Sequence, residues 1–275
     1  MNSIRFSVIM SVYKKDNPVW LKEALDSLLI KQTVKPNEIV LVIDGPIGDD
    51  INTVINDYCV QYGLINVVRL KENKGLGNAL KVAVENANNE YIARMDSDDI
   101  SVPDRFEKEI EFLTNNPDVD VVGGDIAEFI DNPENTIAVR KVPLTDTEIK
   151  KYIKKRCPMN HVSVMFKRDS ILKVGGYLDC FCNEDYYLWI RMWEEKMIFA
   201  NTGEILVNVR VGREMYARRG GKKYYESEKF LQKYMLDKKL IGCTTCIRNI
   251  IIRYIVEVAM SNGMRSWFYK KIARK

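Results

Sequence analysis

Metal-binding side chains other than carboxylates are scarce in this sequence of 275 residues, which contains one histidine and six cysteines. Only Cys243 and Cys246 have the Cys-x-x-Cys spacing of a metal site, and the histidine lies far from them in the sequence. A structural zinc site needs four such ligands, so none is expected here. We interpret the cysteines as free thiols in a reducing cytoplasm.

Long apolar segments are also lacking. No uncharged apolar stretch reaches the roughly 18 residues that a membrane-spanning helix needs. Residues 1–5 enter a predicted strand directly, without the apolar region of a signal peptide. With 46% hydrophobic residues, the chain is expected to be a globular protein with a substantial core.

The charge is distributed unevenly along the chain. Residues 210–275 contain 17 Lys and Arg against five Asp and Glu, whereas the rest contains 25 against 33. The net charge of +4 therefore hides a basic C-terminal part. Such a segment suggests an anionic partner: phosphate, lipid headgroups or nucleic acid.

Predicted strands and helices alternate over the first hundred residues. This alternation is typical of a doubly wound α/β sheet, whose ligands bind beyond the carboxyl ends of the strands. The predicted strands in this part are residues 6–13, 38–43, 67–70 and 91–95. Beyond it we expect helices at 104–113, 184–193, 222–239 and 249–260, strands at 119–125 and 160–166, and a loop at 131–143.

Three carboxylates, Asp96, Asp98 and Asp99, follow the fourth predicted strand. Side chains alternate along a strand, so an Asp-x-Asp pair at its end lies on one side. Such a pair needs a proton, hydration or a divalent cation, which could bridge it to a nucleotide diphosphate. A solvated acidic turn before a helix cap is the alternative. Tyr13, Asp44 and the loop 71–77 also follow strands, which favours the ligand site.

A second acidic pair, Glu184 and Asp185, opens the predicted helix 184–193. Acids in a first helical turn also stabilise the helix dipole, so a structural role is the alternative. The aromatic residues of this helix fit either core packing or a platform for a sugar. They are Tyr186, Tyr187, Trp189 and Trp193.

The C-terminal part ends in aromatic and basic residues. Residues 249–260 are apolar nearly all round but too short to span a bilayer. Residues 267–269 are aromatic and stand beside four Lys and Arg, which resembles an interfacial membrane anchor. Packing of this segment on the rest of the protein is the alternative.

Together these segments resemble the inverting glycosyltransferases of family 2, whose fold is called GT-A. Two further segments, 160–166 and 215–221, resemble bacterial members that build O-antigen or exopolysaccharide repeat units on undecaprenyl diphosphate. The segments that carry the general resemblance are residues 7–13, Asp44, 73–77, 94–99, 103–105, 175–177 and Glu184-Asp185.

The resemblance implies a GT-A fold, which is a Rossmann-like, mixed and mainly parallel sheet flanked by helices, with a helical C-terminal extension. Residues 1–100 would form the nucleotide-sugar-binding half and 101–215 the acceptor-binding and catalytic half of one domain. Residues 216–275 would be a basic helical segment that associates with the membrane. The enzyme would work in the cytoplasm, peripherally on the bacterial inner membrane.

The implied reaction moves galactose or glucose from a UDP-sugar to an N-acetylhexosamine-diphosphate-undecaprenol acceptor, giving a β linkage, with Mn²⁺ or Mg²⁺ as cofactor. Asp98 would bind the metal and Asp96 the ribose or metal-bound water. Asp185 would be the general base, with Glu184 next in line. The other implied donor-site residues are Tyr13, Asp44 (at uracil or ribose), Lys74 and Gly75, and the acceptor-side residues are His161 and Trp189.

The sequence departs from the family at one point. Many relatives carry an Arg-x-His pattern after the catalytic acid, where this chain has Arg210-Val211-Gly212. Water, Arg213 or the pair Arg218 and Arg219 would then stabilise the diphosphate.

Two functions of other classes fit the sequence less well. A protein that binds nucleotides or nucleic acid through the basic terminus would show an RNP-like or helix-turn-helix pattern, and neither is present. A nucleotidyltransferase would show a basic glycine-rich loop near the N-terminus. We therefore expect no nucleic acid partner.

Overall fold

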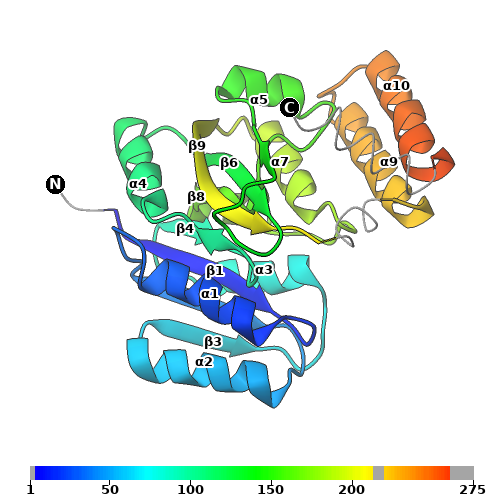
Figure 1. Cartoon of the computed structure of the whole chain (residues 1–275). Coiled ribbons are helices and arrows are strands. Elements are labelled where there is room, and N and C mark those ends of the chain that lie inside the picture. Colours follow the sequence, from blue (N-terminus) through cyan, green and yellow to red (C-terminus); the bar gives the residue numbers. More distant parts are fainter. Residues whose placement is uncertain (1–3, 213–219, 261–275) are drawn as a thin grey trace.

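The computed structural model describes residues 4–212 and 220–260. Its centre is one mixed sheet in the strand order β3-β2-β1-β4-β8-β6-β9-β5, with β7 paired to β6 (Figure 1). The first four strands along the chain pair in parallel, as predicted. They are β1 (Phe6–Val12), β2 (Glu38–Ile43), β3 (Ile65–Arg69) and β4 (Tyr91–Arg94).

The second half of the sheet mixes directions. Strand β8 pairs antiparallel with β4 and with β6, while β9 pairs parallel with β6. The GT-A expectation of a mixed sheet is confirmed, and the parallel part is its first half. These strands are β5 (Ile100–Ser101), β6 (Val121–Phe129), β7 (Ala138–Arg140), β8 (Met165–Lys167) and β9 (Phe199–Arg210).

The second half of the sheet differs from the sequence-based expectation at three points. Residues 160–166 are not one strand, because a 3₁₀ turn, His161–Ser163, precedes the short β8. The predicted loop 131–143 contains β7. The long strand β9 was not predicted, since polar residues around Gly203 interrupt its apolar pattern and its pairing with β6 shifts register.

Helices cover both faces of the sheet and create two cores. Because side chains alternate along β1, Val8 and Met10 pack toward α1, α2 and α4, whereas Ile9 packs toward α3 and α7. The first group is α1 (Pro18–Leu29), α2 (Asp49–Tyr62) and α4 (Arg105–Asn115). The second group is α3 (Leu76–Asn86), α5 (Asp146–Tyr152), α6 (Arg168–Lys173) and α7 (Glu184–Glu194).

The C-terminal helices, α9 (Lys222–Asp237) and α10 (Cys243–Tyr254), pack beside α7 at the right of Figure 1. Leu231, Met235 and Cys246 belong to the same core as Trp189. A π-helical turn, Ile255–Ala259, extends α10. The described part of 216–275 therefore packs on the domain, the alternative weighed above. None of the described helices combines the length and apolar character needed to cross a membrane.

Candidate active site

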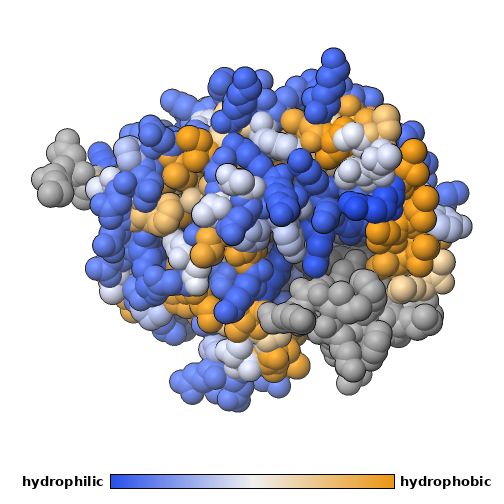
Figure 2. Space-filling view, turned by 90° about the horizontal axis from the view of Figure 1, so that it is seen from above, coloured by the Kyte–Doolittle hydropathy of each residue, from blue (hydrophilic) through white to orange (hydrophobic). Residues whose placement is uncertain are grey.

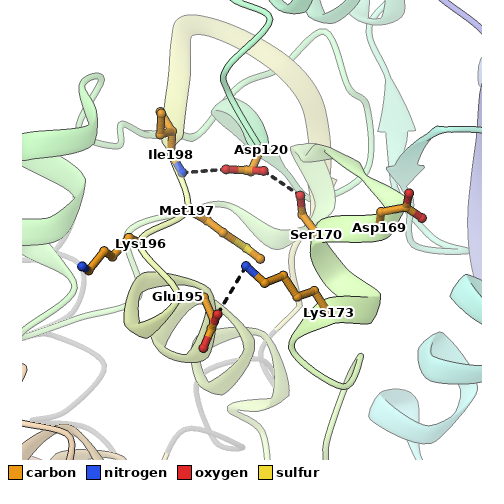
Figure 3. Close-up of a pocket in the computed structure, with 8 residues that line it drawn as sticks. All are labelled: Asp120, Asp169, Ser170, Lys173, Glu195, Lys196, Met197 and Ile198. Carbon is orange, nitrogen blue, oxygen red and sulfur yellow. Dashed lines mark hydrogen bonds and ion pairs between the residues drawn. The ribbon is translucent and has the colours of Figure 1, made fainter.

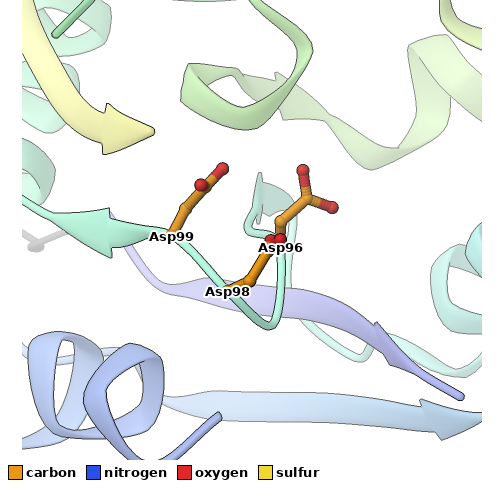
Figure 4. Close-up of side chains that lie close together, drawn as sticks. All are labelled: Asp96, Asp98 and Asp99. Atoms are coloured by element: carbon orange, nitrogen blue, oxygen red, sulfur yellow. The ribbon is translucent and has the colours of Figure 1, made fainter. Parts of the chain in front are cut away.

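The acidic turn after β4 gathers Asp96, Asp98 and Asp99 (Figure 4). One carboxylate oxygen from each residue lies within 4.8 Å of the others. Mg²⁺ and Mn²⁺ prefer oxygen ligands, and these three carboxylates supply them. The residues present therefore fit a hard divalent cation. The helix-cap alternative for this turn does not fit Asp99, because its buried carboxylate accepts a hydrogen bond from the Arg210 backbone N–H at 2.8 Å.

Beneath the turn, the buried guanidinium of Arg94 makes a two-pronged ion pair with Asp96. Its Nη1 donates to Asp96 Oδ2 at 2.7 Å, and Nη2 donates to Oδ1. Burial opposes the positive charge, but the neighbouring carboxylate of Asp96 raises the pKa of Arg94 on balance. Arg94 therefore stays charged and holds Asp96, whereas Asp98 and Asp99 form no ion pair with a Lys or Arg side chain of residues 4–212 and 220–260.

Crowding of like charges marks the rest of this turn. Burial, followed by the charges of Asp96 and Asp16, raises the pKa of Asp98 to about 6. Asp16, after β1, accepts hydrogen bonds from Ser97 Oγ at 2.8 Å and from the Tyr13 backbone N–H at 3.1 Å. Asn17 caps α1, so Asp16 is left to join the acidic turn through Ser97.

Asp44, after β2, supports the loop that begins α3. Its carboxylate accepts the backbone N–H of Lys74 at 2.7 Å and that of Gly75 at 2.9 Å. The loops approach closely, because a Cβ on Gly45, at φ +85°, would lie 2.5 Å from the Asn73 nitrogen. Asp44 thus orients the N-terminus of α3, and its contact with a nucleotide stays a prediction. Lys74 itself is exposed beside Glu72.

The pair Glu184 and Asp185 lies in the first turn of α7, and Glu184 packs against the start of α3. A Cβ on Gly77 of α3 would lie 3.3 Å from Glu184 Cβ, so the two helix starts are in contact. Burial, then the charge of Asp185, raises the pKa of Glu184 to about 7, and the charges of Arg94 and Asp96 also act on it. The structure therefore places the two acidic segments in one electrostatic neighbourhood.

Asp185 faces a different element. Its Oδ2 accepts a hydrogen bond from Cys157 Sγ at 3.4 Å, in the segment after α5. Burial raises the pKa of Cys157 well above its ordinary value, so the thiol keeps its proton and acts as donor. Sequence reasoning gave Cys157 no role at the site, because a lone cysteine has no motif.

The two acceptor-side predictions fare differently. Trp189 is fully buried and meets the rings of His161 and Phe199 edge-on, which fits the core-packing alternative, and its acceptor-side role stays a prediction. It belongs to the inward stripe of α7, which favours core packing. His161 is half-buried, and its Nε2 lies 2.8 Å from the hydroxyl of Tyr177. Burial lowers the pKa of His161 well below its ordinary value, so the ring is neutral.

Arg210 is committed to structure. Its guanidinium donates to the Asp98 carbonyl at 3.2 Å and to Glu23 Oε2 at 2.5 Å, and it stacks between the rings of Trp20 and Phe129. It therefore ties β9 to the acidic turn. The predicted diphosphate partners, Arg213, Arg218 and Arg219, lie outside the described residues.

A polar surface pocket of about 340 Å³ lies near the amino ends of β6 and β9, at the sheet edge opposite the acidic turn (Figure 3). Several of the polar groups that line it form hydrogen bonds or ion pairs with one another. Asp120 accepts from Ser170 Oγ and the Ile198 backbone N–H, and Lys173 pairs with Glu195. We assign it no role at the site.

Comparison with known proteins agrees with the fold and identifies the family. Residues 7–175 match the family described as glycosyl transferase family 2. The chain is 37% identical over 271 residues to an Escherichia coli UDP-Gal:alpha-D-GlcNAc-diphosphoundecaprenol beta-1,3-galactosyltransferase, covering 98% of this chain and 97% of that protein. It is 35% identical over 266 residues to the Erwinia amylovora amylovoran biosynthesis glycosyltransferase AmsE, covering 97% and 98%.

Solved structures share the fold at low sequence identity. S. aureus TarS 1-349 in complex with UDP-GlcNAc matches with a TM-score of 0.68 and 17% identity, covering 98% of this chain and 76% of that one. The mannosyltransferase PcManGT from Pyrobaculum calidifontis, in complex with GDP-Man and Mn²⁺, matches with a TM-score of 0.62 and 15% identity, covering 95% and 71%.

Proposed function

This chain belongs to glycosyl transferase family 2, and from that membership we propose that it transfers galactose or glucose from a UDP-sugar to an N-acetylhexosamine on a lipid-linked diphosphate. The transfer inverts the donor linkage to β and extends a repeat unit of O-antigen or exopolysaccharide. The substrates named for the E. coli relative, which matches along nearly its whole length, support this proposal. The UDP-GlcNAc complex of the same fold supports a UDP-sugar donor.

The observation that carries the proposal is the meeting of two acidic segments that lie almost ninety residues apart. The charges of Arg94 and Asp96 act on Glu184, and Glu184 touches the start of α3. Transfer of a sugar requires a donor diphosphate and an attacking hydroxyl in the same place. The carboxyl end of the sheet supplies groups for both.

On the donor side, Asp96, Asp98 and Asp99 would hold Mn²⁺ or Mg²⁺. A bound divalent cation supplies neutralisation of the charge that develops on the leaving diphosphate. The α3 N-terminus, oriented by Asp44 through Lys74 and Gly75, offers backbone N–H groups to the same anion. Tyr13, at the end of β1 and 36% exposed, completes the proposed donor contacts.

On the acceptor side, Asp185 is the proposed general base, with Glu184 next in line. Glu184 packs against the start of α3, which we assign to the donor side, whereas Asp185 accepts a hydrogen bond from Cys157 in the half that we assign to the acceptor. This arrangement supports Asp185 as the residue nearer the acceptor. Asp185 would remove the proton of the attacking hydroxyl, a contribution of about 10²–10⁴-fold in rate for such a base.

The proposed division places the donor in residues 1–100 and the acceptor in residues 101–215. Because the acceptor is a lipid, we place the enzyme peripherally on the cytoplasmic face of the bacterial inner membrane. The basic residues of 216–275 fit an anionic leaflet. No observation in the described residues favours a nucleic acid partner.

A donor panel tests this function directly. UDP-galactose, UDP-glucose and UDP-N-acetylglucosamine are each incubated with a synthetic GlcNAc-diphosphate-lipid, and the products are analysed by mass spectrometry and linkage analysis. We expect one hexose to be added in β linkage, from one UDP-hexose, and only with Mn²⁺ or Mg²⁺ present. The Asp185→Asn variant should lose at least about 100-fold in transfer rate.

The control is Asp179→Asn, which changes a nearby exposed carboxylate in the loop before α7. It should keep activity close to that of the unmodified protein. Failure of every UDP-hexose with a folded protein would overturn the proposed donor class. Full turnover by Asp185→Asn would move the base to Glu184.

A further inference from the structure

The outward face of α10 and of the turn after it is almost wholly apolar. In the segment 243–259, Arg248 is the one charged residue among those that the structure shows exposed. A surface helix normally turns polar side chains outward. We call the exposed apolar side chains of this segment the α10 face. They are Ile247 (59% exposed), Ile251 (53%), Ile252 (49%), Tyr254 (51%), Ile255 (46%) and Val258 (36%).

The inner side of α10 fixes this orientation. Asn249 Nδ2 donates to the Lys154 carbonyl at 2.8 Å and to Gln232 Oε1 at 2.9 Å. Arg253 donates to the Lys155 carbonyl at 2.8 Å. Rotating the helix to bury its isoleucines would break these bonds and leave buried polar groups without partners. These hydrogen bonds therefore keep the α10 face turned outward.

A buried charge cluster adds to this anchoring. Arg253 lies 3.4 Å from Glu228 of α9 and 3.2 Å from Glu257 of the following turn, and both carboxylates are buried. Breaking a buried ion pair is strongly unfavourable, so α10 is held to α9 in one register. Figure 2 shows the result from above, a hydrophobic strip over α10 at the right of the molecule.

We propose that the α10 face is the surface by which this protein contacts an anionic lipid bilayer. The inference rests on the proposed function, because the acceptor of that function is lipid-linked. The helix would lie in the interface with its isoleucines among the lipid chains, since none of the described helices is suited to crossing the bilayer.

Charge favours a bilayer over a second copy of the chain as the occupant. The face belongs to the part of the chain, 210–275, that holds 17 basic and five acidic residues. Exposed lysines of α9 and of the turn into α10, such as Lys233 and Lys239, stand close to it in the sequence. Two such surfaces would repel each other, whereas an anionic leaflet attracts them.

Vesicle flotation tests the proposal with the full-length protein. The probes are vesicles of phosphatidylcholine alone and of phosphatidylcholine mixed with phosphatidylglycerol, at low and at high salt. We expect binding to the anionic vesicles that weakens with salt. The triple variant Ile247→Gln, Ile251→Gln, Ile255→Gln should bind about tenfold or more weakly, because it removes three apolar side chains from the interface.

The matched control replaces three isoleucine or valine residues that lie elsewhere and are similarly or more exposed: Ile30→Gln, Val60→Gln and Ile137→Gln. It should bind vesicles like the unmodified protein. Circular dichroism and thermal melting of both variants show whether they are folded. Equal vesicle binding by the folded triple variant, or no binding by the unmodified protein, would overturn the proposal. A dimer that the triple variant dissociates, with vesicle binding unchanged, would identify a second copy instead.

Transfer to a water-soluble GlcNAc-diphosphate acceptor with a short lipid chain separates this inference from the proposed function. The triple variant should keep that activity while losing vesicle binding. If the protein binds vesicles through the α10 face but transfers no sugar, the membrane-contact proposal is supported and the proposed function is contradicted. If it transfers sugar but does not bind vesicles, the proposed function is supported and the membrane-contact proposal is contradicted.

Discussion

At the scale of single residues, the position of Glu184 lowers the stability of the fold while serving the proposed function. The carboxyl is largely buried beside Asp185 and Asp96, and burial is the first cause of its raised pKa of about 7. A residue kept for folding alone would not be placed among like charges without a paired cation. Its cost to the fold is therefore consistent with a role in chemistry.

This conflict predicts that Glu184→Gln stabilises the protein at high pH. The raised pKa means that the folded state holds the proton more tightly than the unfolded state, whose ordinary value is 4.5. The contribution of Glu184 to the free energy of unfolding is fully present below pH 4.5 and is lost as the pH rises from 4.5 through 7. At about pH 8 the variant should be more stable by about 1–3 kcal/mol, measured by urea unfolding with a chelator present.

The control is the same comparison of the variant and the unmodified protein in acidic solution. Below pH 4.5 Glu184 is protonated in both states, so the variant and the unmodified protein should have nearly equal free energies of unfolding. A variant that is less stable at high pH would show that the Glu184 carboxylate makes a favourable contact in the fold.

The sequence located most acidic residues of the site but not their partners. Asp96, Asp98, Glu184 and Asp185 stand at the ends of predictable elements, so their places could be inferred. Contacts across the fold were not predictable, because nothing local to Asp44 shows that it caps a loop thirty residues away. The same holds for Asp16 and Cys157, which reach the site only through tertiary packing, and for the contact of Asp99 with the Arg210 backbone.

At the scale of elements, α9 connects the C-terminal helices to the acidic pair. Ser227 Oγ accepts a hydrogen bond from Asn183 Nδ2 at 3.1 Å, and Asn183 immediately precedes Glu184. The same hydroxyl lies 3.3 Å from Cys180 Sγ. α9 thus fixes the loop that presents the first turn of α7.

Arg253 links α10 to α9 through buried ion pairs. Replacing Arg253 by Met should lower the free energy of unfolding by about 3–5 kcal/mol, because it removes the ion pairs that Arg253 makes with the buried carboxylates of Glu228 and Glu257. Arg248→Met, on the exposed side of the same helix, should change stability by less than about 0.5 kcal/mol. Urea unfolding followed by circular dichroism compares the two.

Equal stability of these two variants would contradict a role for Arg253 in docking α10. It would mean that the helix is held by its apolar contacts alone. The apolar pattern of 249–260 predicted a helix but misplaced its start, which lies at Cys243, because its buried face is partly polar. A pattern of hydrophobicity does not reveal a buried Asn249 or Arg253.

At the scale of the molecule, one sheet joins a parallel half to a mixed half. The parallel half was predictable, because strands buried on both faces are continuous apolar runs. The order of β8, β6 and β9 was not, since short strands and register shifts carry little sequence signal. The acidic turn lies where these halves meet, after β4, which pairs with β1 on one side and β8 on the other.

The proposed mechanism requires that UDP binding depend on the acidic turn and a divalent cation, and that it be independent of the proposed base. Isothermal titration of UDP tests this with the unmodified protein, Asp98→Asn and Asp185→Asn, each with Mn²⁺ and with EDTA. We predict Mn²⁺-dependent binding by the unmodified protein and Asp185→Asn, and a loss of at least about tenfold in affinity for Asp98→Asn. UDP binding that is unchanged by EDTA and by Asp98→Asn would contradict the mechanism.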